Sequence, residues 1–500
     1  MVLKPHLDDL KIIGYYLGKI TIGIGLFMLI PIICALGFKE VSPTFDFFIG
    51  IGASFLLGFI LTRVCFTDKD LNWMQGMIVV SLSWLIATII GAIPLYLSGH
   101  WASYLDACFE SMSGFATTGL TLVQDLDHLS YAHNLWRHLA PFLGGQGIAI
   151  VALSLFVSGS SGAFKMYVGE AREEKILPNV IQTARFIWII SIIYLLIGTI
   201  SLGVTGILIG MKPQNAFFHG ACIFMAGFDT AGFAPQSQNI LYYHSFSFEI
   251  VTILIMIIGT LNFNLHYHLW SGNYKEIFKN IETRTLILSS TLIFFIVAIG
   301  LKQLNVYPGL VMFFRKGFFQ LISGHSTTGF QTIYAQQFIK EWGSFALGGI
   351  ICAMALGGCA CSTAGGIKML RLGIILKALK EDIRRIMLPE KAVVVQKFHH
   401  IKNIFLDDKQ VRAALLITLC YLVLYCVGAL IGMFCGYPFL ESLFESTSAA
   451  ANVGFSCGVT NAGMPAILKV TYIIQMWAGR LEFMSIFTLL GFLVAAVKGK

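Results

Sequence analysis

The sequence predicts an all-α polytopic membrane protein, and its composition, its apolar runs and a fourfold internal repeat carry that prediction. Hydrophobic residues make up 56% of the 500 residues and charged residues only 12%, about half the charged fraction of a typical soluble protein. A soluble chain of this size has too little interior to bury so many apolar side chains. The composition therefore excludes a soluble multidomain protein, a disordered chain, collagen and a coiled coil.

Apolar runs of the length needed to cross a bilayer, about 20 residues, recur along the chain. The first is read as a span and not as a cleaved signal, because Asp8 and Asp9 occupy what would be a basic region. The eighth is broken by glycines and is too long for one clean span. The expected spans are 12–38, 46–64, 72–98, 132–158, 183–210, 246–270, 284–304, 343–379, 411–434 and 467–497.

The placement of lysine and arginine sets the expected orientation. Of the 34 such residues, 25 fall on the side of the N-terminus, eight fall on the other side, and Arg480 lies within the last span. Basic residues concentrate on the cytoplasmic side of membrane proteins. We therefore expect a multi-pass protein of the bacterial plasma (inner) membrane with both termini in the cytoplasm.

Four semi-apolar stretches between the spans form an internal repeat. They read FESMSGFATTGL, CIFMAGFDTAGF, FQLISGHSTTGF and FESTSAAANVGF, are too short to cross the bilayer, and align on one glycine each. The expected unit is span, short pore helix, glycine loop, span. Two N-terminal spans at 1–71 precede four units at 72–178, 179–282, 283–407 and 408–500.

The physics of this unit favours a cation pore. A short helix that stops in mid-membrane aims its partly negative C-terminus at the bilayer centre, and extended backbone is tolerated there only where it lines water. Four glycine loops around one axis can offer a ring of carbonyl oxygens that replaces the water around a dehydrated monovalent cation. Close helix packing is the alternative for a single copy. The predicted filter residues are Thr117, Thr118, Gly119, Thr230, Ala231, Gly232, Thr327, Thr328, Gly329, Asn452, Val453 and Gly454.

The eighth run contains the segment GGCACSTAGG at 357–366. Four glycines and no large side chain cannot hold a stable helix in lipid. We expect an intramembrane loop that gates the path below the filter, although a helix kink for close packing would also explain it. The predicted gate residues in this loop are Gly357, Gly358, Ser362, Thr363, Gly365 and Gly366.

Arg480 lies near the middle of the last span, where a charge costs at least about 2.5–3.5 kcal/mol unless it meets water or a partner. We expect it to face the cavity below the filter and to donate hydrogen bonds to carbonyls of the glycine loop. A structural ion pair with Glu482 is the alternative, although residues two apart on a helix do not face each other.

Other polar residues near the predicted pore are weaker candidates. Asp125, Asp127 and Asp229 are grouped as outer-mouth acids that concentrate cations, although Asp229 falls at the inner end of its short helix, beside the filter. Solvated loop carboxylates are the plain alternative. Small or polar residues of the inner helices are expected to line a cavity or to pack closely: Gly144, Gly145, Gly147, Gly259, Asn262 and Asn264.

The repeats resemble the Trk/Ktr/HKT superfamily of potassium transporters, and the two N-terminal spans and the loop GEAREEKILPNVIQTAR resemble its TrkH branch. The resemblance implies potassium uptake, a homodimer with a pore in each subunit, and a cytoplasmic TrkA-like nucleotide-binding regulatory subunit. It also implies a gating role for the glycine loop and an arginine at the position of Arg480. Gly119 implies potassium rather than sodium, whereas Asn452 and Val453 depart from the family pattern and imply less symmetric coordination.

The resemblance leaves the transport mechanism open. A sodium- or proton-coupled potassium symporter and a poorly selective sodium/potassium transporter are the alternatives. Potassium is the metal ion expected, with membrane lipid as a partner and with no organic cofactor, nucleic acid or enzymatic activity. An intramembrane serine protease, with Ser161 in a GxSG pattern and His266 or His268 as base, is a remote alternative.

Overall fold

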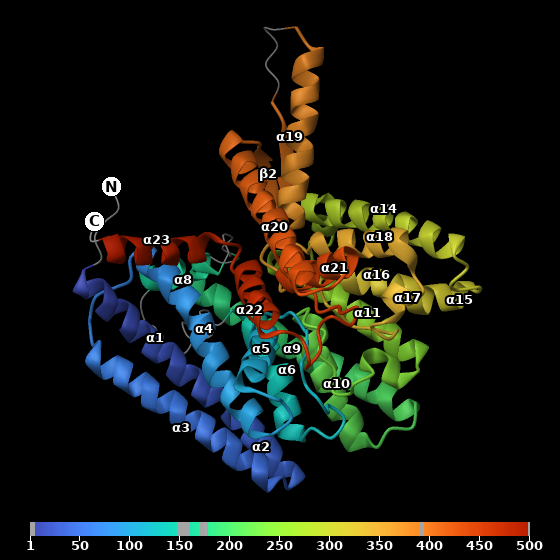
Figure 1. Cartoon of the computed structure of the whole chain (residues 1–500). Helices are drawn as coiled ribbons and strands as arrows, with labels where there is room; N and C mark the ends of the chain where they lie inside the picture. Colours follow the sequence, from blue (N-terminus) through green and yellow to red (C-terminus); the bar gives the residue numbers. More distant parts are fainter. Residues whose placement is uncertain (1–5, 148–159, 171–175, 177–178, 390–394, 499–500) are drawn as a thin grey trace.

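The structure is a computed structural model that describes residues 6–147, 160–170, 176, 179–389 and 395–498. It is built almost entirely of helices around one centre, with one small hairpin (Figure 1). The hairpin pairs β1 (Lys397–His400) with β2 (Lys402–Phe405). The all-α membrane fold predicted from the sequence is confirmed.

The N-terminal part is a helical hairpin that packs on the first repeat. α1 (Leu7–Phe27) continues into α2 (Leu29–Phe38), and α3 (Val41–Val64) returns beside α1. The two helices approach closely, because a Cβ built on Gly18 would lie 2.8 Å from the carbonyl oxygen of Gly58. Small residues allow such backbone contact between helices in lipid.

The four repeats follow with the same order of elements. The outer helices are α4 (Trp73–Leu97), α9 (Val180–Leu208), α14 (Ile281–Gln303) and α20 (Asp408–Phe434). The pore helices are α5 (Tyr104–Phe115), α10 (Pro213–Phe228), α16 (Phe319–His325) and α21 (Phe439–Ala450), and α16 extends the short α15 (Leu310–Met312) and the π-helical η2 (Phe313–Phe318). The inner helices are α6 (Tyr131–Gln146), α11 (Phe246–Thr260), α18 (Gly343–Ala355) and α22 (Ala466–Arg480).

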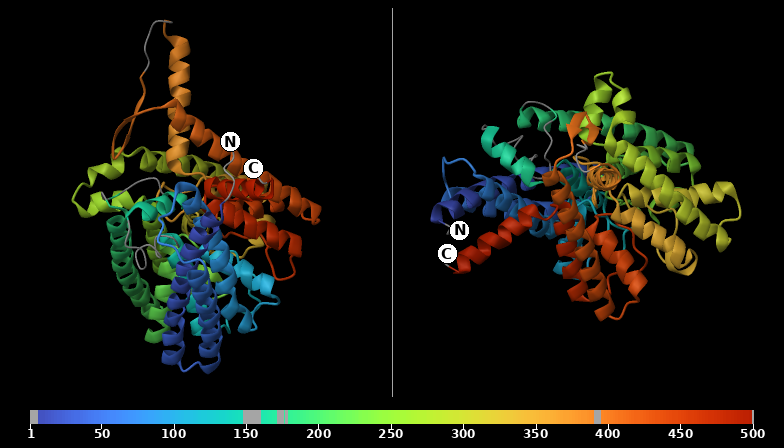
Figure 2. Two further views of the ribbon diagram at one scale, coloured as in Figure 1. Left: turned by 90° about the vertical axis from the view of Figure 1, so that its left-hand side faces the viewer. Right: turned by 90° about the horizontal axis from the view of Figure 1, so that it is seen from above.

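The remaining elements of the described chain lie within or between these units or follow the last of them. They are α8 (Ser160–Gly169), η1 (Asn239–Tyr243), α12 (Phe263–Trp270), α13 (Lys275–Lys279), α17 (Gln337–Lys340), α19 (Met369–Met387) and α23 (Met484–Lys498). α19 projects from the body of the molecule, and α1 begins near the place where α23 ends (Figures 1 and 2).

The inner helices are interrupted, which corrects the expectation of continuous spans at 246–270 and 467–497. The chain bends by 103° between α11 and α12 and by 113° between α22 and α23. Within the described residues, six helices are long and apolar enough to cross a membrane, or up to eight if each bent pair counts as one. The predicted span 132–158 contains α6 to Gln146, and 148–159 fall outside the described residues.

A close backbone contact lies beside three of the breaks. A Cβ on Gly144, Gly259 or Gly479 would lie 1.8, 2.0 or 1.9 Å from a carbonyl oxygen at the end of the neighbouring pore helix. Three of the four inner helices, α6, α11 and α22, thus touch a pore helix backbone to backbone. Each ends within two residues of that contact, at Gln146, Thr260 and Arg480.

Candidate ion pathway and gate

Two residues after each of the four pore helices ends, the chain has a residue in the left-handed region. The φ angles are 54° at Thr117, 50° at Thr230, 55° at Thr327 and 54° at Asn452. This conformation is rare for a β-branched residue and costs of order 1–3 kcal/mol. The next amide holds it by donating back into the helix: the four N···O distances are 2.8 Å for Thr118 to Ser113, 2.7 Å for Ala231 to Ala226, 2.9 Å for Thr328 to Ser323 and 2.9 Å for Val453 to Ser448.

The four filter glycines form a closed ring. Their φ angles lie between 65° and 93°, a region that side chains rarely adopt. A Cβ on each glycine would strike a carbonyl oxygen of the following repeat: Gly119 against Ala231 at 1.9 Å, Gly232 against Thr328 at 2.1 Å, Gly329 against Val453 at 1.9 Å and Gly454 against Thr118 at 2.1 Å. The loops therefore surround one centre in the order of the repeats, with no room for a side chain.

Asn452 keeps the backbone of the fourth loop equivalent to the other three. Asparagine tolerates the left-handed region better than threonine does, and its φ matches theirs. Its side chain donates hydrogen bonds to Thr118 Oγ1 at 3.0 Å and to the Met476 carbonyl at 2.9 Å. The departure from the threonine pattern therefore changes the side-chain contacts and not the conformation of the loop.

Buried polar side chains hold the chain that leaves the filter. Glu110 accepts hydrogen bonds from Thr121 and from the Leu122 amide and forms a 2.8 Å ion pair with Arg137. Glu445, its equivalent in the fourth repeat, accepts from the Cys457 amide at 2.9 Å and from several neighbours. The sequence showed the match between the two glutamates, but the partners lie on segments that only the fold brings together.

The glycine segment at 357–366 forms a loop between α18 and α19. Its two ends meet in a parallel β-bridge, in which the Gly357 amide donates to the Ile367 carbonyl at 3.0 Å and the Ile367 amide donates to the Ala355 carbonyl at 3.1 Å. The loop is therefore closed at its base.

The loop lies against the inner ends of the other repeats. Thr363 Oγ1 donates to the carbonyl oxygens of Phe228 at 2.8 Å and Gly259 at 2.9 Å. The Gly365 amide donates to Thr327 Oγ1 at 2.8 Å, and a Cβ on Gly365 would lie 2.2 Å from the Ala451 carbonyl oxygen. The tip of the loop thus contacts the residues that begin or precede three of the filter loops.

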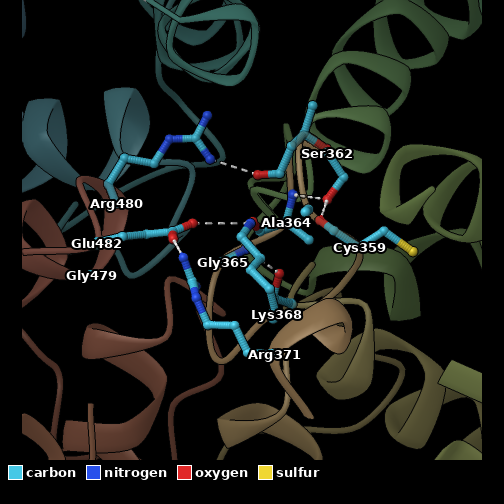
Figure 3. A network of polar contacts seen from close by, with 12 residues as sticks. Cys359, Ser362, Ala364, Gly365, Lys368, Arg371, Gly479, Arg480 and Glu482 are labelled. Atoms are coloured by element: carbon cyan, nitrogen blue, oxygen red, sulfur yellow. Dashed lines mark hydrogen bonds and ion pairs between the residues drawn. The ribbon is translucent and has the colours of Figure 1, made fainter. Parts of the chain in front are cut away.

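Arg480 supplies the contact with the remaining filter loop. Its guanidinium donates to the Thr363 carbonyl at 2.6 Å and to Thr117 Oγ1 at 3.3 Å. It also donates to the Gly144 and Gly145 carbonyls at 2.7 and 3.2 Å. The expected hydrogen bond from Arg480 to a loop carbonyl is present, and Figure 3 shows the guanidinium aimed at the loop.

Glu482 pairs with residues beyond the loop. Its carboxylate contacts Arg371 and lies 3.8 Å from Lys368 Nζ, while Lys368 also donates to the Ala364 carbonyl (Figure 3). A second buried carboxylate, Glu282, accepts from the Ala360 amide at 2.5 Å and from Asn262 at 3.1 Å. Two carboxylates from different repeats thus hold the two sides of the loop.

The three grouped acids do not share one environment. Asp125 and Asp127 are exposed on the loop that follows the first filter. Asp127 accepts from the Ser237 amide at 2.8 Å and from its hydroxyl at 2.6 Å, which joins the first two repeats. Desolvation raises the pKa of the Asp125 carboxyl, but His128 lowers it through hydrogen bonds and charge, so its pKa lies below the ordinary value.

Asp229 is not an outer-mouth acid, because it caps the inner end of α10, is fully buried and accepts a 3.0 Å hydrogen bond from Gln146. This corrects its grouping with Asp125 and Asp127. The short helix ends toward the centre of the molecule, so its last residue lies on the side of the filter away from the mouth.

Three other cations of the described residues, besides Arg480, are buried inside the protein. Arg137, Lys368 and Lys469 are each less than 9% exposed, and Lys469 forms a 2.5 Å ion pair with Asp106. Among the described residues no group of three His, Cys, Asp or Glu side chains could hold a metal ion.

Comparison with known proteins identifies the family to which the chain is similar. A sequence profile of the TrkH family, described as a cation transport protein, matches residues 44–494. An uncharacterized cation transporter of Methanocaldococcus jannaschii is 32% identical over 482 residues, which cover 96% of this chain and 95% of that protein. The Trk system potassium uptake protein TrkG of Escherichia coli is 27% identical over 490 residues, covering 95% of this chain and 96% of that protein.

The fold agrees with a solved structure of the same family. The crystal structure of the potassium transporter TrkH from Vibrio parahaemolyticus superposes with a TM-score of 0.81 over 96% of this chain and 98% of that one, at 23% identity. With the profile covering most of the chain, the protein belongs to the TrkH family of cation transport proteins.

Proposed function

We propose that this chain takes up potassium through a single channel-like pore whose filter is the ring of Gly119, Gly232, Gly329 and Gly454. The observation that carries the proposal is the closed packing of each glycine on a carbonyl of the next repeat. Backbone oxygens held in this way can replace the hydration shell of a monovalent cation. The four pore helices add their partly negative C-termini to the same centre. The names of the relatives, several of them potassium uptake proteins, favour potassium as the ion.

The glycine loop and Arg480 form the proposed gate. The loop tip contacts Thr230 and Thr327, and Arg480 contacts Thr117, so together they cover the inner face of the ring. A fixed guanidinium there repels a cation that leaves the filter, while the loop fills its path. Opening requires the loop to leave its hydrogen bonds with Phe228 and Gly259.

The proposal extends to the setting of the protein. We place it in the plasma (inner) membrane of a bacterium as a homodimer with both termini in the cytoplasm, and we expect a cytoplasmic TrkA-like nucleotide-binding subunit to regulate it. The lysine and arginine bias supports the orientation. α19 and the hairpin, which project on the side that this bias assigns to the cytoplasm, supply the surface for such a subunit (Figure 1). The repeat boundaries at 72, 179, 283 and 408 belong to the same proposal.

Reversal potentials test the transport mode. The purified chain in liposomes is exposed to potassium, sodium and pH gradients imposed one at a time. A selective channel gives a reversal potential that follows the potassium gradient alone. A shift with the sodium or pH gradient at a fixed potassium gradient would establish the symporter instead, and equal weight for sodium and potassium would establish the poorly selective transporter.

Family membership decides against an intramembrane serine protease, because TrkH-family chains are transporters and not enzymes. His266 is engaged by the Ile258 carbonyl at 3.1 Å and by the Tyr194 hydroxyl at 3.3 Å. The side chain of Ser161 lies outside the described residues.

A further inference from the structure

A second site lies away from the pathway, in a cavity of about 480 Å³ between α14, α19 and the β hairpin. Five cationic side chains line it from four different elements: Lys279 of α13, Arg284 of α14, Lys377 and Lys380 of α19, and Lys397 of β1. None of the residues that line the cavity is an aspartate or a glutamate.

The five cations lack carboxylate partners among the described residues. No ion pair of Lys279, Arg284, Lys377, Lys380 or Lys397 with an acid is found in that part of the chain. Arg284 donates to the Phe278 carbonyl at 2.8 Å, and the Lys397 ammonium lies 4.5 Å from the centre of the Phe405 ring. The acid Glu276, on the same short helix as Lys279, is engaged by His399 at 3.0 Å.

Like charges that converge in one cavity repel each other unless an anion joins them. The positive-inside rule explains why basic residues lie on this side of the membrane. It does not explain why residues from four elements turn toward one space that contains no acid. The first turn of α14, at the partly positive end of the helix dipole, also lies at this cavity through Arg284 and Ile281, although Asn280 Oδ1 already accepts from the Glu282 amide.

The apolar part of the cavity indicates the source of the anion. Leu288 of α14 and Leu376 of α19 line it and are 54% and 44% exposed. From Leu288 the exposed face of α14 continues through Leu292, Phe295 and Ile299. These positions follow one side of a helix long and apolar enough to cross the bilayer, so a chain lying on them would be an acyl chain.

We propose that this cavity binds the headgroup of an anionic phospholipid of the cytoplasmic leaflet, with its phosphate among the five cations and an acyl chain along the exposed face of α14. Basic pockets between membrane helices recognise lipid headgroups in this way. The volume suits a glycerol phosphate group. The site would thereby fix the base of α19, the helix that continues from the gate loop, against the membrane.

Native mass spectrometry of the detergent-purified chain tests the proposal. The chain is titrated with phosphatidylglycerol and, in parallel, with phosphatidylcholine, and the affinity of the tightest anionic lipid is measured. Lys377→Gln combined with Lys380→Gln should weaken that lipid roughly thirtyfold, because each cation near the membrane contributes about 1 kcal/mol. The matched control removes two exposed cations that do not line the cavity, Lys402 of β2 and Arg412 of α20, by Lys402→Gln with Arg412→Gln. It should change the affinity less than about threefold.

Three results would overturn the proposal. Equal weakening of lipid binding in both variants would mean that this side of the protein attracts lipid only through its total charge. Displacement of phosphatidylglycerol by millimolar inorganic phosphate would assign the cavity to a free anion, and unchanged binding in both variants would leave it to an acidic protein partner. Arg284→Gln with Lys397→Gln, from the other walls of the cavity, repeats the test should the α19 variant unfold.

Discussion

Arg480 and Thr363, which lie 117 residues apart, are joined by a 2.6 Å hydrogen bond from the guanidinium to the carbonyl oxygen. The same guanidinium reaches Thr117 Oγ1 at 3.3 Å. One cation of the fourth repeat therefore connects the loop of the third repeat with the first filter loop, directly below the ring of glycines.

Removing this cation should increase transport. A charge about 6 Å from a passing ion raises its energy by roughly 2–3 kcal/mol at an effective dielectric constant near 20, which is a tenfold to hundredfold effect where this barrier limits the rate. Arg480→Ala should therefore raise basal potassium flux in proteoliposomes. Arg480→Lys keeps the charge but loses several directed hydrogen bonds and should give an intermediate flux.

Arg412→Ala removes an exposed arginine in the first turns of α20. It serves as the control and should transport like the parent. If Ala and Lys at position 480 also behaved like the parent, Arg480 would not lie in the pathway. A lower flux from a folded protein would mean that the arginine stabilises the open state.

Gly119→Ser should narrow the preference for potassium over sodium. At a φ of 90° the new Cβ would lie 1.9 Å from the Ala231 carbonyl oxygen, so that oxygen must turn away from its place in the ring. The permeability ratio of the two ions in flux assays measures the effect.

Gly436→Ser is a matched control for strain. Gly436 has a φ of 93°, but no atom lies within 4 Å of a Cβ built there. This variant carries the conformational cost without the collision, so its selectivity should equal that of the parent. Unchanged selectivity in Gly119→Ser as well would refute the filter assignment.

The four filter loops could be predicted from the sequence because their signal is local and repeated. Each stretch carries its small residues and its glycine within twelve positions, and the left-handed conformations at Thr117 and its equivalents need only the adjoining helix end. The conformation of the loop is encoded where it is formed.

The breaks in the inner helices could not be predicted in the same way. A glycine such as Gly259 or Gly479 in an apolar run reads alike whether the helix continues or ends. What decides is the carbonyl oxygen of Phe228 or Ala450 pressed against it, and that contact depends on how two helices pack.

The partners of Glu482 were missed for a similar reason. Arg371 lies 111 residues away. It belongs to the segment 368–412, whose many basic residues indicate a cytoplasmic loop. Glu482 itself was weighed only against its neighbour Arg480. An ion pair between distant segments leaves no local pattern to find.

Deleting residues 358–365 should raise potassium flux and leave selectivity largely intact, because the loop obstructs the path and lies below the ring that coordinates the ion. The β-bridge already holds Gly357 beside Gly366, with a Cβ on Gly357 only 3.0 Å from the Cα of Gly366. The two residues that the deletion joins are therefore already neighbours in the structure. A folded deletion variant that transports nothing would show that the segment is structural.

A single substitution tests whether Thr363 anchors the glycine loop, separately from whether the loop obstructs the path. Thr363→Val removes the hydrogen bonds to the Phe228 and Gly259 carbonyls, so the loop should leave its place more often and flux should rise, by less than in the deletion. Ser362→Ala is the control, since its hydroxyl bonds only the Cys359 carbonyl and the Ala364 amide within the loop. The same flux in both variants would mean that Thr363 does not anchor the loop.

Glu482→Gln should destabilise the protein, because it leaves Lys368 and Arg371 buried beside a neutral group. The side chains of Glu482 and Arg371 are only 7% and 16% exposed, and removing one partner of a buried pair costs about 3–5 kcal/mol. The unfolding temperature in detergent should fall by several degrees. Adding Arg371→Gln removes the excess charge and should recover part of the loss, so the two changes together cost less than their sum.

The pair of Glu381 and Arg385 on α19 supplies the comparison. Its arginine side chain is 60% exposed and its glutamate side chain 13%, so the charge that remains after Glu381→Gln lies in solvent, and pairs of that kind contribute about 0–1 kcal/mol. Glu381→Gln should therefore leave the unfolding temperature nearly unchanged. The small effect of Arg385→Gln should simply add to that of Glu381→Gln, with no coupling between the two substitutions. If Glu482→Gln lowered the temperature no more than Glu381→Gln does, the Glu482 carboxylate would not hold the base of the glycine loop. The loop would then be held by Glu282, by the β-bridge and by the contacts of Thr363 and Gly365.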